Sequence, residues 1–234
     1  GTALAVRLGQ MGIPYSPAEG VARVGEAIDK IRALWAGERL PSGMPGLPPL
    51  QAMFAPVHRV PIFIAAYRTP MMQLAGQKAD GYLARPAESI PGFKLLVRRM
   101  FTAAEAVGRD PKAIECSGYL LSLIDTTRRE ALNRAKREPF VIYMMSILSD
   151  ITLQRAGFEP ALRDAIAAAW RAEEFHKAQS LIPDELLDAF LLCGTADEVA
   201  ARAWEYHEAG MQVPLLQPIV QDEEQVGAVL RAAV

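Results

Sequence analysis

The chain has 234 residues, of which 51% are hydrophobic and 22% charged, values that are typical of one globular domain. A formal net charge of -2 argues against nucleic acid or an anionic membrane as a partner. Cys116 and Cys193 form no CxxC pattern, which argues against a disulfide scaffold or a zinc site and favours a cytoplasmic location. The longest apolar run, residues 140–148, is too short for a bilayer, which needs about 20 residues.

The first part of the chain predicts one helix followed by an irregular loop. Apolar residues recur at helical spacing over residues 17–36, with Ser16 as a candidate N-cap and Gly37 as the stop signal. Residues 40–57 are rich in proline and glycine, which predicts a connector without a strand of its own.

Residues 60–85 predict the unit around which the chain is organised: strand, loop, helix, strand. Residues 60–66 form a short apolar run that indicates a buried parallel strand. We expect Thr69 to be the N-cap and Pro70 the first residue of the following helix, which ends near residues 76–78. The next strand begins at Tyr82.

The start of this helix is a candidate anion site. Free N–H groups at a helix N-terminus attract phosphate, and parallel α/β folds bind ligands at the carboxyl ends of their strands. Arg68 would add a charged donor beside that helix start. The alternative is an ordinary capped strand–helix unit without a ligand, since every α/β protein contains several such turns.

The rest of the chain predicts two more strands among many helices. We expect a helix over residues 89–107, a strand over 114–124, and a helix that is capped by Asp125 and covers 128–149. Residues 150–190 predict several helices and no strand. A helix over 196–209, a strand over 213–219 and a helix over 223–233 complete a count of four strands.

No dense catalytic cluster stands out in the sequence. His58, His176 and His207 are widely separated and lack metal-binding spacing, so no metal site is expected. Neither a P-loop, nor G-x-S-x-G, nor G-x-G-x-x-G is present. The catalytic residues therefore stay unassigned.

The run PIFIAAYRTPMMQLAGQKADGYLA, residues 61–84, resembles the central motif of the luciferase-like flavin and deazaflavin oxidoreductases. The similarity is greatest to the branch that resembles methylenetetrahydromethanopterin reductase. Two further stretches agree with the family, GEAIDKIRALWAGE at residues 25–38 and GTADEVAAR at residues 194–202. One departure is that Arg68-Thr69 replaces the usual Gly-Pro of the loop, and glycine there would let the backbone approach a phosphate closely.

This resemblance implies an α/β fold, the (β/α)8 TIM barrel of the luciferase-like type, present as a C-terminal portion with about four parallel strands and a helical insertion. Residues 1–234 would be one N-terminally truncated domain, with Gly1 directly after the fourth barrel strand. Because a half barrel has two open edges, we expect a homodimer or association through those edges.

The resemblance also implies a function and a site. The protein would be an oxidoreductase that transfers a hydride between reduced coenzyme F-420 and a small organic substrate, with an FMN-dependent monooxygenase as the rival. The cofactor-binding residues implied by matching motif positions are Ala65, Ala66, Tyr67, Arg68, Thr69, Pro70 and Met71. Arg85 would bind an acidic group of the substrate or the cofactor tail, and catalytic residues would come from the missing strands. A hypothesis of another class is a non-catalytic half-barrel fragment or binding module.

Overall fold

The computed structural model describes residues 8, 9, 11–14 and 16–233. The chain divides into two compact units, one made of Gly1–Tyr82 and Arg98–Ile114, the other of Leu83–Val97 and Glu115–Val234. The expected position of Gly1 after a barrel strand lies outside the described residues. The assignment of the whole chain to one domain stays a prediction.

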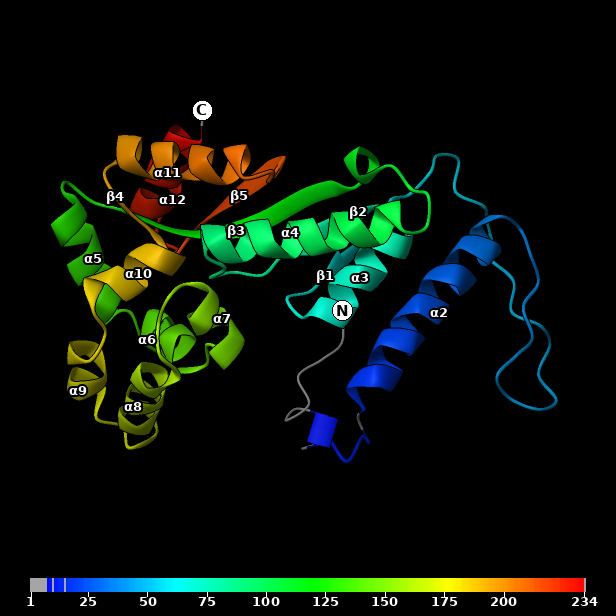
Figure 1. The fold of residues 1–234 in the computed structure, drawn as a ribbon, viewed down its shortest axis with the longest axis horizontal. Coiled ribbons are helices and arrows are strands. Elements are labelled where there is room, and N and C mark those ends of the chain that lie inside the picture. Colours follow the sequence, from blue (N-terminus) through cyan, green and yellow to red (C-terminus); the bar gives the residue numbers. More distant parts are fainter. Residues whose placement is uncertain (1–7, 10, 15, 234) are drawn as a thin grey trace. The chain divides into compact units, whose positions relative to one another are not determined.

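The first unit is built on a helix, a short strand and a second helix (Figure 1). Helix α2 spans Pro17–Trp35, and Ser16 caps it by accepting a bond from the N–H of Glu19. Strand β1 covers Phe63–Ala65, shorter than the strand expected over 60–66, and helix α3 covers Thr69–Lys78. Ile64 is buried but Ala65 is exposed, so the expectation of a strand buried along its length was wrong. The 3-10 helix η1, Pro111–Ala113, also belongs to this unit. Helix α4 spans Ile90–Glu105, and its residues from Arg98 onward belong to the first unit.

Close packing of α3 on α4 forms the core of the first unit. Met72 and Met100 are fully buried, and a side chain on Gly76 would collide with the carbonyl oxygen of Met100, only 2.1 Å from where its Cβ would stand. Glycine at this position therefore lets the two helices approach more closely than any other residue would.

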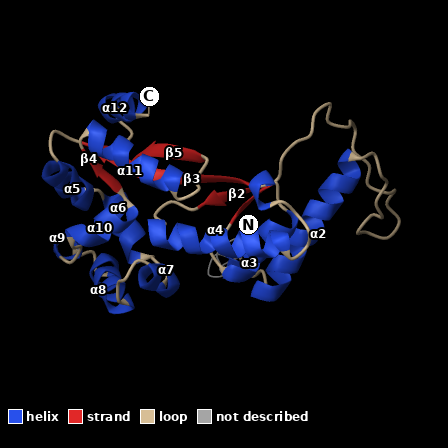
Figure 2. Cartoon of the chain, turned by 45° about the horizontal axis from the view of Figure 1, so that its top comes forward, coloured by secondary structure: helices blue, strands red, loops and turns tan. Residues whose placement is uncertain are grey.

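The second unit contains a parallel sheet centred on β3, Glu115–Ile124 (Figure 2). Strand β5, Val213–Pro218, pairs with β3 from Ser117 opposite Val213 to Ser122 opposite Pro218. Strand β4, Leu192–Gly194, pairs in parallel with residues 122–124 of β3. Strand β2, Gly81–Ala84, ends in this unit.

Helices of the second unit cover the sheet and build most of its core. They are α5 (Arg128–Arg137), α6 (Pro139–Ser146), α7 (Asp150–Arg155), α8 (Pro160–Arg171), α9 (Phe175–Ser180), α10 (Asp184–Phe190), α11 (Ala196–Glu208) and α12 (Glu223–Ala232). Leu121 and Leu123 of β3 pack in one buried cluster with the apolar faces of α5 to α10. The expected helical insertion over residues 150–190 is thus confirmed.

Three expectations about these elements were wrong. The count of four strands omitted β4, whose three residues are too few for a periodic pattern. The helix expected over 128–149 is broken at Pro139, because proline inside a helix removes a hydrogen bond and clashes with the preceding turn. Thr127, and not Asp125, caps α5, since its hydroxyl accepts from the N–H of Glu130.

Candidate functional site

The connection from β1 to α3 is the candidate anion site of the first unit. Arg68 is the N-cap of α3 and Thr69 its first residue, so the expectation that Thr69 is the cap and Pro70 the first residue was wrong by one position. Arg68 has φ -105° and ψ 143°, ordinary extended backbone, so replacement of the family glycine introduces no strain there. Its guanidinium lies over the ring of Tyr67, 5.7 Å from the ring centre.

The start of α3 has the electrostatics of an anion site. No side chain caps this helix by a hydrogen bond, and its first turn contains no acidic residue. Arg99, on α4 in the same unit, donates to the hydroxyl of Thr69. Two arginines, Arg68 and Arg99, are thus placed at a helix end that already carries partial positive charge. The N–H groups of Met71 and Met72 bond to the carbonyl of Arg68, so they are not the donors that a ligand would use.

The predicted cofactor residues differ in what they can offer a ligand. Ala65, Arg68 and Pro70 are exposed, and Tyr67 and Thr69 are half-buried. Ala66 and Met71 are buried. The carbonyl of Ala66 accepts a hydrogen bond of 3.1 Å from the hydroxyl of Tyr82. This buried bond holds the backbone directly after β1 in place. The side chain of Met71 belongs to the core, so only its backbone lies at the helix start.

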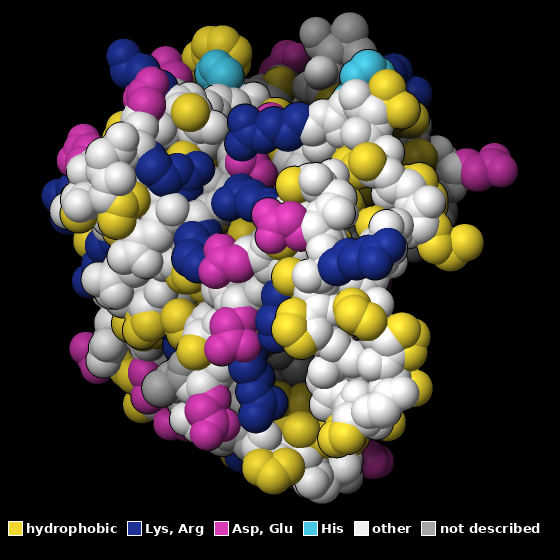
Figure 3. Space-filling model, turned by 90° about the vertical axis from the view of Figure 1, so that its right-hand side faces the viewer, with side chains coloured by type: hydrophobic (Ala, Val, Ile, Leu, Met, Phe, Trp, Pro, Cys, Tyr) yellow, Lys and Arg dark blue, Asp and Glu magenta, His cyan; other side chains and the backbone are white. Residues whose placement is uncertain are grey.

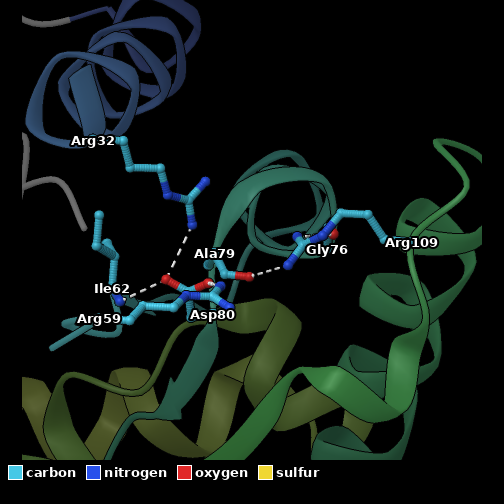
Figure 4. Close-up of polar contacts among 7 residues, drawn as sticks. All are labelled: Arg32, Arg59, Ile62, Gly76, Ala79, Asp80 and Arg109. Atoms are coloured by element: carbon cyan, nitrogen blue, oxygen red, sulfur yellow. Dashed lines mark hydrogen bonds and ion pairs between the residues drawn. The ribbon is translucent and has the colours of Figure 1, made fainter. Parts of the chain in front are cut away.

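A polar cluster around Asp80 holds this unit together (Figure 4). The Asp80 carboxylate accepts from the backbone N–H of Ile62 at 2.9 Å, from Arg32 of α2 at 3.0 Å and from Arg59. Arg109 donates to the carbonyls of Gly76 and Ala79 at 2.6 and 2.7 Å, which satisfies the end of α3. The cluster thereby fixes both the start of β1 and the end of α3.

Charge–charge contacts also line the outer face of this unit. Helix α2 carries the exposed pairs Glu19–Arg23 and Glu26–Lys30, each at 3.7 Å, and Figure 3 shows basic and acidic side chains intermixed beside hydrophobic ones. The loop over residues 40–57 also exposes large apolar side chains, namely Met44, Leu47, Leu50, Met53, Phe54 and Val57. The solvated charged face expected of an amphipathic helix is present on α2.

Arg85, the predicted substrate residue, directly follows β2 in the second unit. Its guanidinium Nη2 donates to the hydroxyl of Thr152 at 3.0 Å and to the carbonyl of Ala87 at 3.4 Å. Its Nε lies 3.6 Å from a carboxylate oxygen of Glu88, and 22% of the Arg85 side chain is exposed. Arg85 is therefore a held side chain with a minor part open to solvent, and its role toward a ligand stays a prediction.

Glu88 is the buried carboxylate of this cluster, with a side chain that is only 2% exposed. Burial raises the pKa of the Glu88 carboxyl, while the charges of Arg85 and Arg155 act in the opposite direction. Tyr206 donates its hydroxyl to the Glu88 carbonyl at 2.8 Å, and burial raises the pKa of this phenol. Residues from α7 and α11 thus converge on the loop that follows β2.

Sequence reasoning missed Arg99, Glu88 and Thr152. Arg99 and Thr152 lie far along the chain from the residues that they contact, so no local pattern connects them. Glu88 follows Arg85 by three residues, a spacing that permits an ion pair, but nothing in the sequence marks it as buried. Among the described residues, no group of three or more His, Cys, Asp and Glu side chains lies close enough to hold a metal ion. In the part of the chain that the structure describes, no helix is both long and apolar enough to cross a membrane.

An open hollow of about 470 Å³ lies on the second unit, apart from these clusters. Its lining is Asp125, Glu130, Asn133, Arg134, Arg137 and Glu138. Acidic and basic side chains are mixed in this lining, and Arg134 pairs with Asp222 at 3.3 Å. The hollow therefore favours neither an anion nor a cation, and we assign it no ligand.

Comparison with solved structures defines the class of fold. The F420-dependent tetrahydromethanopterin reductase of Methanopyrus kandleri superposes with a TM-score of 0.77 at 20% identity, over 99% of this chain and 70% of that chain. An F420-dependent secondary alcohol dehydrogenase, in complex with an F420-acetone adduct, gives a TM-score of 0.67 at 18% identity, over 97% of this chain and 64% of that chain. The fold is thus the luciferase-like TIM-barrel type, present in part, which confirms the predicted fold class.

The family follows from sequence comparison. The model of the luciferase-like monooxygenase family matches residues 3–212, so the chain belongs to this family. The 5,10-methylenetetrahydromethanopterin reductase of Methanolobus tindarius is 30% identical over 167 residues, which are 70% of this chain and 50% of that protein. A phthiodiolone/phenolphthiodiolone dimycocerosates ketoreductase of Mycobacterium sp. strain JLS is 28% identical over 80% of this chain and 53% of that protein. The chain spans about half the length of the curated relatives that it matches.

Proposed function

We propose that this chain binds coenzyme F-420 for an oxidoreductase reaction with a small organic substrate, with the coenzyme phosphate at the start of α3. The observation that carries the proposal is the pair Arg68 and Arg99 at a helix N-terminus whose first turn lacks acidic residues. This donor set fits a phosphate, because guanidinium groups and a helix N-terminus both favour an anion. The titles of two solved structures of this fold name F420 as the coenzyme of those proteins, which supports F-420 over FMN.

In this proposal the residues of the chain bind and orient, and chemistry comes from the coenzyme. When bound, reduced F-420 supplies a hydride to the substrate, which also gains a proton, and the coenzyme is left oxidised. Arg68 and Arg99 would neutralise the phosphate, and the bond from Tyr82 to the Ala66 carbonyl would keep the strand exit in place for it. No residue of this chain is proposed as an acid, base or nucleophile.

The test is a fluorescence titration of the purified chain with F-420 and, separately, with FMN. We expect saturable F-420 binding at micromolar levels, weakened at least about tenfold by Arg68→Glu, since that variant replaces an attractive charge by a repulsive one. Arg98→Glu is the matched control, because Arg98 is an exposed arginine of α4 in the same unit. Saturable binding of FMN alone would favour the rival monooxygenase, and binding of neither would contradict the proposed site.

Turnover separates the enzyme from the binding module. Oxidation of reduced F-420 is followed by absorbance, first with methylenetetrahydromethanopterin, the substrate in the names of several relatives. Turnover by the isolated chain contradicts the hypothesis of a non-catalytic module. Binding without turnover favours that hypothesis, and addition of a barrel half from a relative would then test for restored activity.

We also propose that copies of the chain associate through the sheet of the second unit. Tyr119 and Leu215 are opposite one another on β3 and β5, and with Val213 they are 37–39% exposed. Apolar side chains on a sheet face are normally covered. Light scattering after size exclusion should show a dimer that dissociates in Leu215→Lys, and a monomer at every concentration would contradict this proposal.

A further inference from the structure

An open hollow of about 290 Å³ lies in the first unit, beside the residues that precede β1. Its lining combines charged side chains with apolar ones, chiefly Arg32, Trp35, Val57, Arg59, Val60 and Asp80. We call this space the Asp80 hollow. Small-molecule sites start at roughly 300 Å³, so the space is large enough for a small organic ligand and larger than a single inorganic ion needs.

The Asp80 hollow carries more positive than negative charge. Arg32 and Arg59 both donate to the one carboxylate of the lining, Asp80 (Figure 4). Burial lowers the pKa of the nearby Arg109, the charge of Asp80 acts against this, and the positive charges of Arg32 and Arg59 lower it further. The remaining titratable group of the lining, His58, is exposed and adds only positive charge when it is protonated. Three guanidinium groups thus share one carboxylate, and a second anion would relieve their mutual repulsion.

The two lining guanidinium groups have donors left for a ligand. The side chain of Arg59 is 81% exposed, and among the described residues it bonds to Asp80 alone, through Nη2. Arg32, 39% exposed, likewise reaches Asp80 through Nη2. Because a guanidinium has five N–H donors in a planar fork that matches a carboxylate, most of these donors stay open. Asp80 therefore orients both side chains without using up their capacity.

The rest of the lining offers an apolar wall. Trp35, the last residue of α2, is half-buried, while Val57 is 91% and Val60 44% exposed. An indole ring favours contact with a planar apolar group, and exposed apolar side chains gathered around a hollow are typical of a binding site. Cations beside an aromatic wall suit a ligand with a carboxylate at one end and a ring at the other.

We propose that the Asp80 hollow is a second ligand site, which takes a small aromatic carboxylate. The carboxylate of the ligand meets Arg59 and Arg32, and its ring lies against Trp35. A monoanion fits better than a phosphate dianion, because Asp80 repels the additional negative charge. The site is separate from the proposed coenzyme site of the same unit, since the hollow is lined by residues that precede β1 whereas Arg68 follows this strand.

The probe is 2-naphthoate, and the indole N–H signal of Trp35 in proton–nitrogen spectra, assigned by its loss in Trp35→Phe, reports on the site. We expect this signal to shift saturably with a dissociation constant on the order of 0.1–1 mM, a usual affinity for a ligand of this size. The neutral 2-naphthamide should bind at least about tenfold more weakly. Acetate, which has the charge without the ring, should not saturate the signal.

Matched variants locate the binding. Arg59→Gln should weaken 2-naphthoate binding about tenfold. Arg39→Gln should not, because the exposed Arg39 of the same unit bonds to Gln51 and lies outside the hollow. If Arg59→Gln does not fold, the exposed Val57 decides: Val57→Asp should weaken binding by placing a negative charge in the lining, and Val57→Asn should bind several-fold more tightly than Val57→Asp.

The inference is overturned if 2-naphthoate does not saturate the Trp35 signal up to about 10 mM. Equal affinities of 2-naphthoate and 2-naphthamide, of Arg59→Gln and Arg39→Gln, or of Val57→Asp and Val57→Asn would overturn it as well. Arg68→Glu should leave 2-naphthoate binding unchanged, whereas the proposed function requires that this variant weaken F-420 binding. Failure of this inference and failure of the proposed function are therefore distinguishable.

Discussion

Replacement of Asp80 by asparagine tests whether the polar cluster of the first unit fixes the start of β1. Asp80→Asn keeps the shape of the side chain and removes its charge. The carboxylate is 9% exposed and accepts from Ile62 N–H, Arg32 and Arg59. Because all three donors are directed at one buried group, we expect the variant to lose stability even though its volume is unchanged.

The magnitude follows from the three contacts. Arg59 is 81% exposed, so its pair with Asp80 contributes at most about 0.5 kcal/mol, and the pair with Arg32, which is 39% exposed, contributes about 0.5–1 kcal/mol. The bond from Ile62 N–H to a charged acceptor contributes about 1.5 kcal/mol. Asparagine keeps one acceptor oxygen and so retains part of the last contribution. The expected loss in the free energy of unfolding is therefore about 1–2 kcal/mol.

The pH dependence provides a second signature. Partial burial alone raises the pKa of Asp80, but the bonds from Ile62, Arg32 and Arg59 outweigh it and hold the pKa below its ordinary value of 3.8. A carboxyl whose pKa is lower in the folded state stabilises the protein above its unfolded pKa and loses this contribution as pH falls through the folded value. The difference between wild type and Asp80→Asn should hence be constant near pH 7 and shrink below about pH 4.

Hydrogen exchange at the Ile62 amide is the most local assay. A loss of about 1.4 kcal/mol corresponds to about tenfold faster exchange of this amide where opening is local. Asp29→Asn is the control in the same unit, since Asp29 is 57% exposed and pairs only at the surface with Lys78, so a change below about 0.5 kcal/mol is expected. Unchanged exchange and an unchanged unfolding midpoint in Asp80→Asn would refute the reasoning.

Two further substitutions test the packing and capping on which the site elements depend. Gly76→Ala should lower the free energy of unfolding by about 1–3 kcal/mol, because its Cβ would stand 2.1 Å from the Met100 carbonyl oxygen. Gly43→Ala, with nothing within 4 Å of its Cβ, should be nearly neutral. Equal thermal midpoints for the two variants would contradict this expectation. Thr195→Ala should cost about 1 kcal/mol in urea unfolding, because it removes the hydroxyl that caps α11 opposite Glu198, whereas Thr195→Ser should not.

The sequence predicted those elements whose signals are local. A strand within residues 60–66, the proline and glycine loop over 40–57, and the helix after Gly194 are all present in the structure. Each depends on a period or a cap contained within one element. Strand β4 has no such signal, because three residues cannot show a period and its pairing with β3 depends on residues about seventy positions earlier.

The helix start at Thr69 shows why cap positions are harder to predict. Thr-Pro is a favourable N-cap followed by a first helical residue, so the sequence alone favours Thr69 as the cap. In the structure the Thr69 hydroxyl accepts from Arg99, thirty residues further on, and is not available to cap the helix. A tertiary contact thus overrides a local preference, and it also brings to the site an arginine that no motif indicated.

Arg68, after β1, and Arg85, after β2, differ in exposure and in contacts. This difference explains why Arg68 was easier to interpret from the sequence. Arg68 is exposed and contacts the ring of Tyr67, so its position can be inferred from a motif and a helix start. Arg85 is held by Glu88 and Thr152, and burial of a carboxylate beside it has a cost in hydration that an apolar residue would avoid. Glu88 supplies no apolar packing that a hydrophobic residue could not supply. Glu88 instead fixes the orientation of the Arg85 guanidinium. A fixed donor loses less side-chain freedom when it binds a ligand.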